Sequence, residues 1–291
     1  MADQSADNNH RGRRSNLLPA LVVAAAALVG GHLAASGGDS DASAAPSVPS
    51  TPTSAPTSAP STTPPGPPLP AWSYDGLTNG PAHWADLDPT WAACADVTGQ
   101  SPIQIQDRTA GPVGLQFSYA STAAKVTFDG RVVRLGFSPG SGIVLDGVRY
   151  DLVSGTLHTP SEHTVDGDGF DAELQLLHRN AKGDLAEVAL LISRGERNPL
   201  FDPLFEALDS QVGHAEPTLG PLALADLLPP DRTAVRYTGS LTTPPCTGHV
   251  EWVVLTHTAS ASSQQLQAAT ALTTNSARPA QPVAKRPVIS G

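Results

Sequence analysis

Positive charge is scarce in this sequence. Only 17 lysines and arginines stand against 27 aspartates and glutamates, which gives a formal net charge of −10. Nucleic-acid binding requires clustered cations opposite the phosphates, so we expect no nucleic-acid partner. The sequence also lacks a P-loop and a dinucleotide-binding fingerprint. The glycines of "GSGIVLDG" (140–147) have neither spacing and predict a turn that leads into a strand.

Cysteine is equally scarce, because the chain contains only Cys94 and Cys246. An even number of cysteines in an exported chain favours a disulfide. The alternative is a pair of buried free thiols. Which of the two applies depends on whether the chain leaves the cytoplasm.

Large apolar side chains are almost absent from residues 37–70, which consist mainly of Ser, Thr, Pro, Ala and Gly. Such a segment cannot bury enough surface to offset its ordering entropy, so we expect a disordered, Pro-rich linker. Before it, residues 1–36 carry Arg11, Arg13 and Arg14 and then the apolar run "LLPALVVAAAALVGGHL". This pattern predicts an export signal or an uncleaved N-terminal anchor. Either places the rest of the chain outside the cytoplasm, secreted or tethered to the membrane or cell wall.

Residues 71–291 contain short runs that alternate between apolar and polar residues, and they predict one β-rich domain. Strand pairs are expected within 124–137, 142–158 and 171–195, and a buried strand at 249–257. Asp129-Gly130 and Asp146-Gly147 are strong hairpin signals. Helical patterns are confined to 198–212 and 261–274. The predicted fold class is mainly β, a β-rich α+β domain with a large, mostly antiparallel sheet and minor surface helices.

Four separated stretches of this domain resemble one family. They are "WSYDG" with "NGPAHWADLDPTWAACADVTGQSPIQI", "LHTPSEHTVDGDGFDAELQLLH", "YTGSLTTPPCTGHVEWVVL" and "SARPAQPVAKRPV". In this order they resemble the α-carbonic anhydrases, with the bacterial exported type as the nearest match. The resemblance implies a large twisted antiparallel sheet with the active site in a cone at its centre.

The resemblance also implies a zinc site, and here the sequence departs from the family. Three histidines bind zinc in the family: two at positions i and i+2 of one strand, which point to the same face, and one on the neighbouring strand. His158 matches one ligand of the pair, whereas Thr156 and Gln175 occupy the other two ligand positions. A hydroxyl and an amide are weak zinc donors beside imidazole. His163 and His178 match positions that do not bind the metal.

Other parts of the family's active site persist by resemblance. Thr242 matches the threonine that accepts a hydrogen bond from the zinc-bound hydroxide, and Glu162 matches the acid that orients this threonine. Glu173 matches the acid that holds the third histidine and here faces Gln175. Arg131 stands at the proton-relay position, where an always-protonated guanidinium cannot relay protons.

The resemblance also implies an apolar wall of the active site and a disulfide. Leu177, Leu241 and Trp252 match the wall, and Cys94 and Cys246 match a bridge that ties the N-terminal segment to the loop containing Thr242.

The resulting functional hypothesis is an exported α-carbonic-anhydrase-like domain without zinc and without CO2 hydration, which acts as a binding or scaffold module. No cofactor is expected, and the partner would belong to the cell envelope or be a protein. The alternative is an active zinc-dependent carbonic anhydrase, with CO2 and bicarbonate as substrates and non-standard ligands. A metal-free hydrolase has little support, because the sequence contains no nucleophile elbow.

Overall fold

The computed structural model describes residues 71–211 and 217–291. The predicted export signal or anchor (1–36) and the predicted linker (37–70) therefore lie outside the described residues. Within the described residues, no helix has the length and apolar character needed to cross a membrane.

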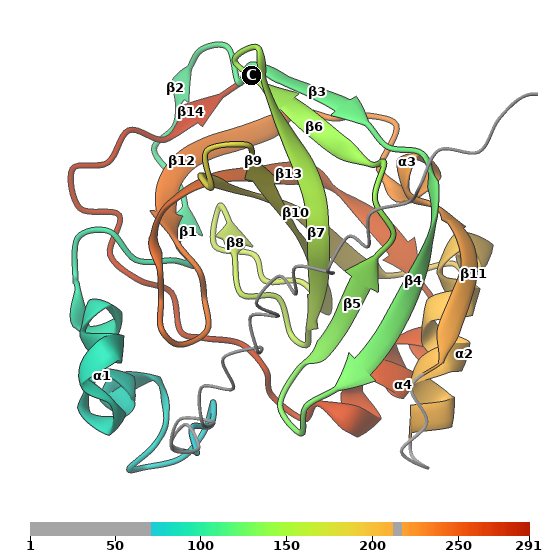
Figure 1. The fold of residues 1–291 in the computed structure, drawn as a ribbon, viewed down its shortest axis with the longest axis horizontal. Coiled ribbons are helices and arrows are strands. Elements are labelled where there is room, and N and C mark those ends of the chain that lie inside the picture. The colour runs from blue at the N-terminus through green and yellow to red at the C-terminus, as the bar shows by residue number, and fades with distance from the viewer. Residues whose placement is uncertain (1–70, 212–216) are drawn as a thin grey trace, which may run out of the picture. The chain divides into compact units, whose positions relative to one another are not determined.

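A twelve-stranded sheet dominates the described part of the chain, in the order β11-β4-β5-β7-β9-β10-β13-β12-β14-β2, with β3 and β6 paired beside β7 (Figure 1). Its neighbours are antiparallel except for the parallel pairs β10–β13 and β14–β2. The expected large, mostly antiparallel sheet is thus confirmed. Its strands are β2 (Thr109–Ala110), β3 (Leu115–Ser118), β4 (Ser121–Phe128), β5 (Val133–Phe137), β6 (Gly142–Leu145), β7 (Val148–His158), β9 (Ala172–Asn180), β10 (Leu185–Arg194), β11 (Thr218–Ala223), β12 (Ala234–Ser240), β13 (Gly248–Ala261) and β14 (Ile289–Ser290). Two further strands, β1 (Gln104–Ile105) and β8 (Thr164–Val165), form a separate parallel pair.

The predicted hairpins form where the sequence placed them. Asp146 and Gly147 connect β6 to β7, and both have positive φ, 49° and 78°. Two successive residues of positive φ make the tight turn whose twist matches that of the flanking strands. Gly130, with φ of 85°, follows Asp129 in the longer connection between β4 and β5.

The helices are short, and the two longest, α2 and α4, pack into the larger hydrophobic core. The predicted helical segments correspond to α2 (Asp202–Gln211), which follows the 3-10 turn η3 (Pro199–Phe201), and to α4 (Ser263–Leu272). Ser262 and Gln265 form a capping box that fixes the start of α4. Figure 1 shows α2 and α4 beside β11 and β4. The remaining helical turns are η1 (Pro81–His83), α1 (Trp84–Leu87), η2 (Pro89–Ala95) and α3 (Leu224–Leu227).

The two faces of the central strands have different roles. On β9, Leu174 and Leu176 belong to the larger hydrophobic core, into which α2 and α4 also pack. Glu173, Gln175 and Leu177 alternate with them and therefore lie on the opposite face. The candidate site is built on that second face.

Candidate functional site

Two adjacent strands bring the matched ligand positions together. Thr156 on β7 is the register partner of Gln175 on β9, and His158 is the partner of Glu173. Because residues two apart share a face, all four side chains lie on one side of the sheet. The strand register thus assembles the positions that the resemblance assigned to the metal.

His158 is fully buried and held by one hydrogen bond. Its Nδ1 lies 2.5 Å from the carbonyl oxygen of Ser276. A carbonyl only accepts, so Nδ1 carries a proton, and in the neutral imidazole Nε2 is then the nitrogen with the lone pair. Nε2 is buried and has no partner among the described residues. The nearest carboxylate, Glu162, lies 3.6 Å from Nδ1. One imidazole nitrogen is therefore available in this site.

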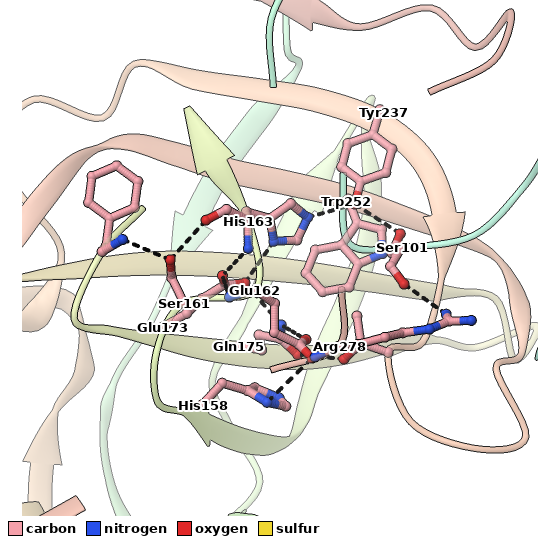
Figure 2. Close-up of polar contacts among 12 residues, drawn as sticks. Ser101, His158, Ser161, Glu162, His163, Glu173, Gln175, Tyr237, Trp252 and Arg278 are labelled. Carbon is pink, nitrogen blue, oxygen red and sulfur yellow. Dashed lines mark hydrogen bonds and ion pairs between the residues drawn. The ribbon is translucent and has the colours of Figure 1, made fainter. Parts of the chain in front are cut away.

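Gln175 is bound on both sides of its amide. The nitrogen donates to Glu162 Oε2 at 2.7 Å and to Glu173 Oε1 at 2.9 Å (Figure 2). The two carboxylates fix the amide orientation, because they accept hydrogen bonds and only the nitrogen can donate to them. The amide oxygen accepts a hydrogen bond of 3.4 Å from the Thr242 hydroxyl. Gln175 is thus a bridge between two buried acids.

Glu173 is the most heavily bonded acid of the site. Its Oε2 accepts the backbone N–H groups of Glu162 and His163 at 2.9 and 2.8 Å, and its Oε1 lies 2.8 Å from His163 Nδ1. Burial alone would raise the pKa of this carboxyl, but the charge of His163 and the hydrogen bonds lower the pKa to about 2. Glu173 is ionised at neutral pH. It faces Gln175, as predicted.

Glu162 and Thr242 are not paired as the resemblance implied. Glu162 accepts from Gln175 through Oε2 and from the backbone N–H of Arg278 through Oε1 at 2.8 Å. The Thr242 hydroxyl donates to Gln175, and the hydrogen bonds of residues 71–211 and 217–291 include none between Thr242 and Glu162. The reason is the glutamine at position 175, since its amide group stands between the two side chains and bonds to both. The expected orienting bond from acid to threonine is therefore replaced by a relay through Gln175.

Arg278 is a site residue that the sequence did not single out. Its side chain is buried, and its guanidinium donates to Gln100 Oε1 and to the carbonyls of Ser101 and Cys94. Burial lowers the pKa of this guanidinium to about 10. Its backbone N–H holds Glu162 (Figure 2). The residues next to Arg278 in the sequence do not indicate that it is buried, because the hydrogen-bond partners of its guanidinium lie more than 170 positions away in the chain.

Arg131 is engaged at the edge of the domain. Its Nε donates to the carbonyl of Trp72 at 2.6 Å, and its guanidinium lies 4.9 Å from the centre of the Trp72 ring. The residue at the proton-relay position therefore anchors the N-terminal segment.

His178 lies on the face opposite Gln175 and contacts Tyr119 at 3.0 Å through Nε2. Burial lowers the pKa of His178 to about 4, so it is neutral at pH 7.

The matched apolar wall contains one acidic residue. Trp252 is buried, and Leu241 packs against the same hydrophobic cluster. Leu177 on β9 and Trp252 on β13 are both register partners of Glu187 on β10. Glu187 is buried, and its Oε2 has no hydrogen-bond partner among the described residues. The sequence interpretation missed this residue, although it is the one charge in the apolar run "LAEVALLIS".

The disulfide between Cys94 and Cys246 is present, with the Cα atoms 5.1 Å apart, and the free-thiol alternative is wrong. The bridge joins η2 to the segment between β12 and β13 that follows Thr242. As expected, it ties the N-terminal part of the domain to the loop over the site.

Residues 71–211 and 217–291 contain no group of three or more His, Cys, Asp or Glu side chains that could hold a metal ion. The chemistry available on this face is hydrogen bonding by buried carboxyl groups, one imidazole nitrogen, hydroxyls and an amide.

Comparisons with known proteins identify the family. A family model described as eukaryotic-type carbonic anhydrase matches residues 79–290. A carbonic anhydrase of Pectobacterium carotovorum is 35% identical over 221 residues, covering 75% of this chain and 90% of that protein. Among solved structures, an α-carbonic anhydrase from Thermovibrio ammonificans in complex with the inhibitor sulfanilamide has 29% identity and a TM-score of 0.68, covering 75% of this chain and 98% of that one. A dioscorin complexed with ascorbate has 31% identity and a TM-score of 0.69, with coverage of 76% and 98%. Together with the sheet and the matched site positions, these similarities show that the chain belongs to the α-carbonic anhydrase family.

Proposed function

We propose that this protein is an α-carbonic anhydrase fold that holds no zinc at the family's site, does not hydrate CO2 and serves as an extracytoplasmic binding module. The observation that carries the proposal is the state of Gln175. Its amide nitrogen is committed to Glu162 and Glu173, and its oxygen to Thr242. A side chain fixed on all sides by its neighbours is a structural element of the site.

The residues at the three ligand positions do not fit zinc. His158 Nε2 supplies one suitable nitrogen. Thr156 offers a neutral hydroxyl, and Gln175 could offer only an amide oxygen. Zinc sites in proteins use histidine, cysteine and carboxylate ligands, three from the protein at a catalytic centre. One imidazole with two neutral oxygens is too weak a set to retain zinc against solvent and chelators.

The binding role draws support from the comparisons and from the chain itself. The similar dioscorin was solved with ascorbate, so a protein of this fold and of 31% identity binds a small molecule other than CO2. The N-terminal apolar segment and the Pro-rich segment after it would place the domain outside the cytoplasm, secreted or tethered. A disulfide between Cys94 and Cys246 fits such an oxidising compartment. A partner in the cell envelope fits this location.

A second candidate function is zinc-dependent CO2 hydration with a non-standard ligand set. The observation in its favour is the free Nε2 of His158, buried and correctly protonated at Nδ1 for a metal ligand. The carbonic anhydrase of Pectobacterium carotovorum at 35% identity is a further argument for it.

Stopped-flow CO2 hydration separates the two functions. The purified domain is measured alone and with added zinc, beside the similar Pectobacterium carotovorum enzyme as the positive control. We expect the rate to equal that of the buffer under both conditions. A zinc-dependent rate above the buffer would establish the second candidate and reject the first.

A further inference from the structure

Glu187 stands on the face of the candidate site. It lies on β10 two positions from Ala189, whose register partner on β9 is Gln175. Residues two apart in a strand share a face, so Glu187 and Gln175 lie on the same side of the sheet. Its own register partners are Leu177 and Trp252. A carboxyl group therefore originates in the middle of the matched apolar wall.

The carboxyl of Glu187 is buried without a hydrogen bond at one of its oxygens, since Oε2 has no partner among the described residues. Burial raises the pKa of this carboxyl well above its usual value, and the negative charges of Glu162 and Glu173 raise it further, while Arg134 lowers it. The group is thus an acid in an apolar and negatively charged surrounding. An unsatisfied buried polar group destabilises a fold, so the packing of the wall alone does not account for this residue.

We propose that Glu187 is a second, independent block to CO2 hydration in this chain, because it replaces the dry surface between Leu177 and Trp252 with a carboxyl group. This inference rests on the proposed function, in which the first block is the ligand set at Thr156 and Gln175. It goes further, since it holds that restoring the ligands alone does not restore the full rate of the reaction.

The physical reason for the block is that CO2 and a carboxyl group require different surroundings. CO2 has no hydrogen-bond donor and no net charge, so a surface that holds it beside a nucleophile must be apolar and free of water. A carboxyl group takes up that surface and attracts water.

Four proteins test the proposal: the parent, E187V, T156H/Q175H and T156H/Q175H/E187V. Zinc per chain after dialysis and CO2 hydration are measured for each. We expect both rebuilt variants to bind one zinc, because Glu173 is already placed to orient a histidine at position 175. We expect the triple variant to exceed the double variant in kcat/KM by about tenfold or more, the effect of removing one unpaired buried polar group. Equal kcat/KM in the two rebuilt variants would overturn the proposal.

Measurements on the parent and on E187V distinguish a failure of the Glu187 proposal from a failure of the proposed function. Both are expected to lack zinc and activity. Zinc-dependent activity in the parent would reject the proposed function, whatever the rebuilt variants do.

Urea unfolding of the near-isosteric variant E187L supplies a readout that needs no metal. At pH 7 we expect its midpoint to equal or exceed that of the parent, because the lost carboxyl has no partner to leave behind. A clear fall in the midpoint would show that the fold requires the carboxyl, and it would overturn the proposal even if neither rebuilt variant retained zinc.

Discussion

Replacing Gln175 with leucine tests the contact that distinguishes this site from a metal centre. The amide nitrogen donates to Glu162 at 2.7 Å and to Glu173 at 2.9 Å, and all three side chains are buried. Hydrogen bonds to charged groups contribute about 1.5–3 kcal/mol each, so losing both costs about 3–6 kcal/mol. Burial of the leucine side chain regains about 1–2 kcal/mol. We therefore expect Gln175→Leu to lower the free energy of unfolding by about 2–4 kcal/mol.

Urea unfolding followed by tryptophan fluorescence measures this change. With an m value of about 2 kcal/mol/M, the midpoint should fall by about 1–2 M. The matched control is Thr156→Val, because Thr156 faces Gln175 across β7 and β9 and is half-buried. Its effect should stay within about 0.5 kcal/mol. If Gln175→Leu changed the midpoint no more than this control, the argument that the amide is a bound donor between two acids would be refuted.

Three further predictions concern stability. Replacing Cys94 and Cys246 together with alanine should lower the free energy of unfolding by up to about 5 kcal/mol, because the bridge closes a loop of 152 positions; an unchanged urea midpoint would contradict this. The pKa of Glu187 is raised on folding because burial penalises its ionised form, so the parent should lose stability as pH rises above the unfolded pKa of about 4.5. The stability of Glu187→Gln relative to the parent should therefore increase from pH 5 to pH 8, measured as the urea midpoint at each pH. A difference between the two midpoints that does not change with pH would contradict this prediction. The pKa of His178 is lowered to about 4, so the parent should lose stability as pH falls from about 6.5 to about 4. His178→Gln should flatten the urea-midpoint profile over that range, and an unaltered slope would show that another group is responsible.

The local signals of the sequence predicted the fold well. Asp146-Gly147 gave a two-residue hairpin because an aspartate and a glycine both tolerate positive φ. The helical pattern at 261–274 corresponds to α4, which begins after Ser262. Gln175 and His178, three positions apart on β9, lie on opposite faces, as the alternation of a strand requires. Each of these features depends on neighbours within a few positions of the chain.

The features that the sequence could not supply depend on distant segments. Glu187 is the one charge in an apolar strand, and only the register with Leu177 and Trp252 reveals that it lies within the matched apolar wall. The partner of Thr242 was expected to be Glu162, because the resemblance carries over a geometry in which the third ligand is a histidine. A glutamine has both a donor and an acceptor, and it can bond to both neighbours at once.

Metal analysis of the purified, mature protein tests the central claim most directly. The protein is dialysed against a mild chelator, and zinc per chain is determined by mass spectrometry. With one histidine at the site and Gln175 bound to its neighbours, we predict far less than one zinc per chain. One zinc per chain surviving dialysis would contradict the account and show that His158 belongs to a working metal centre.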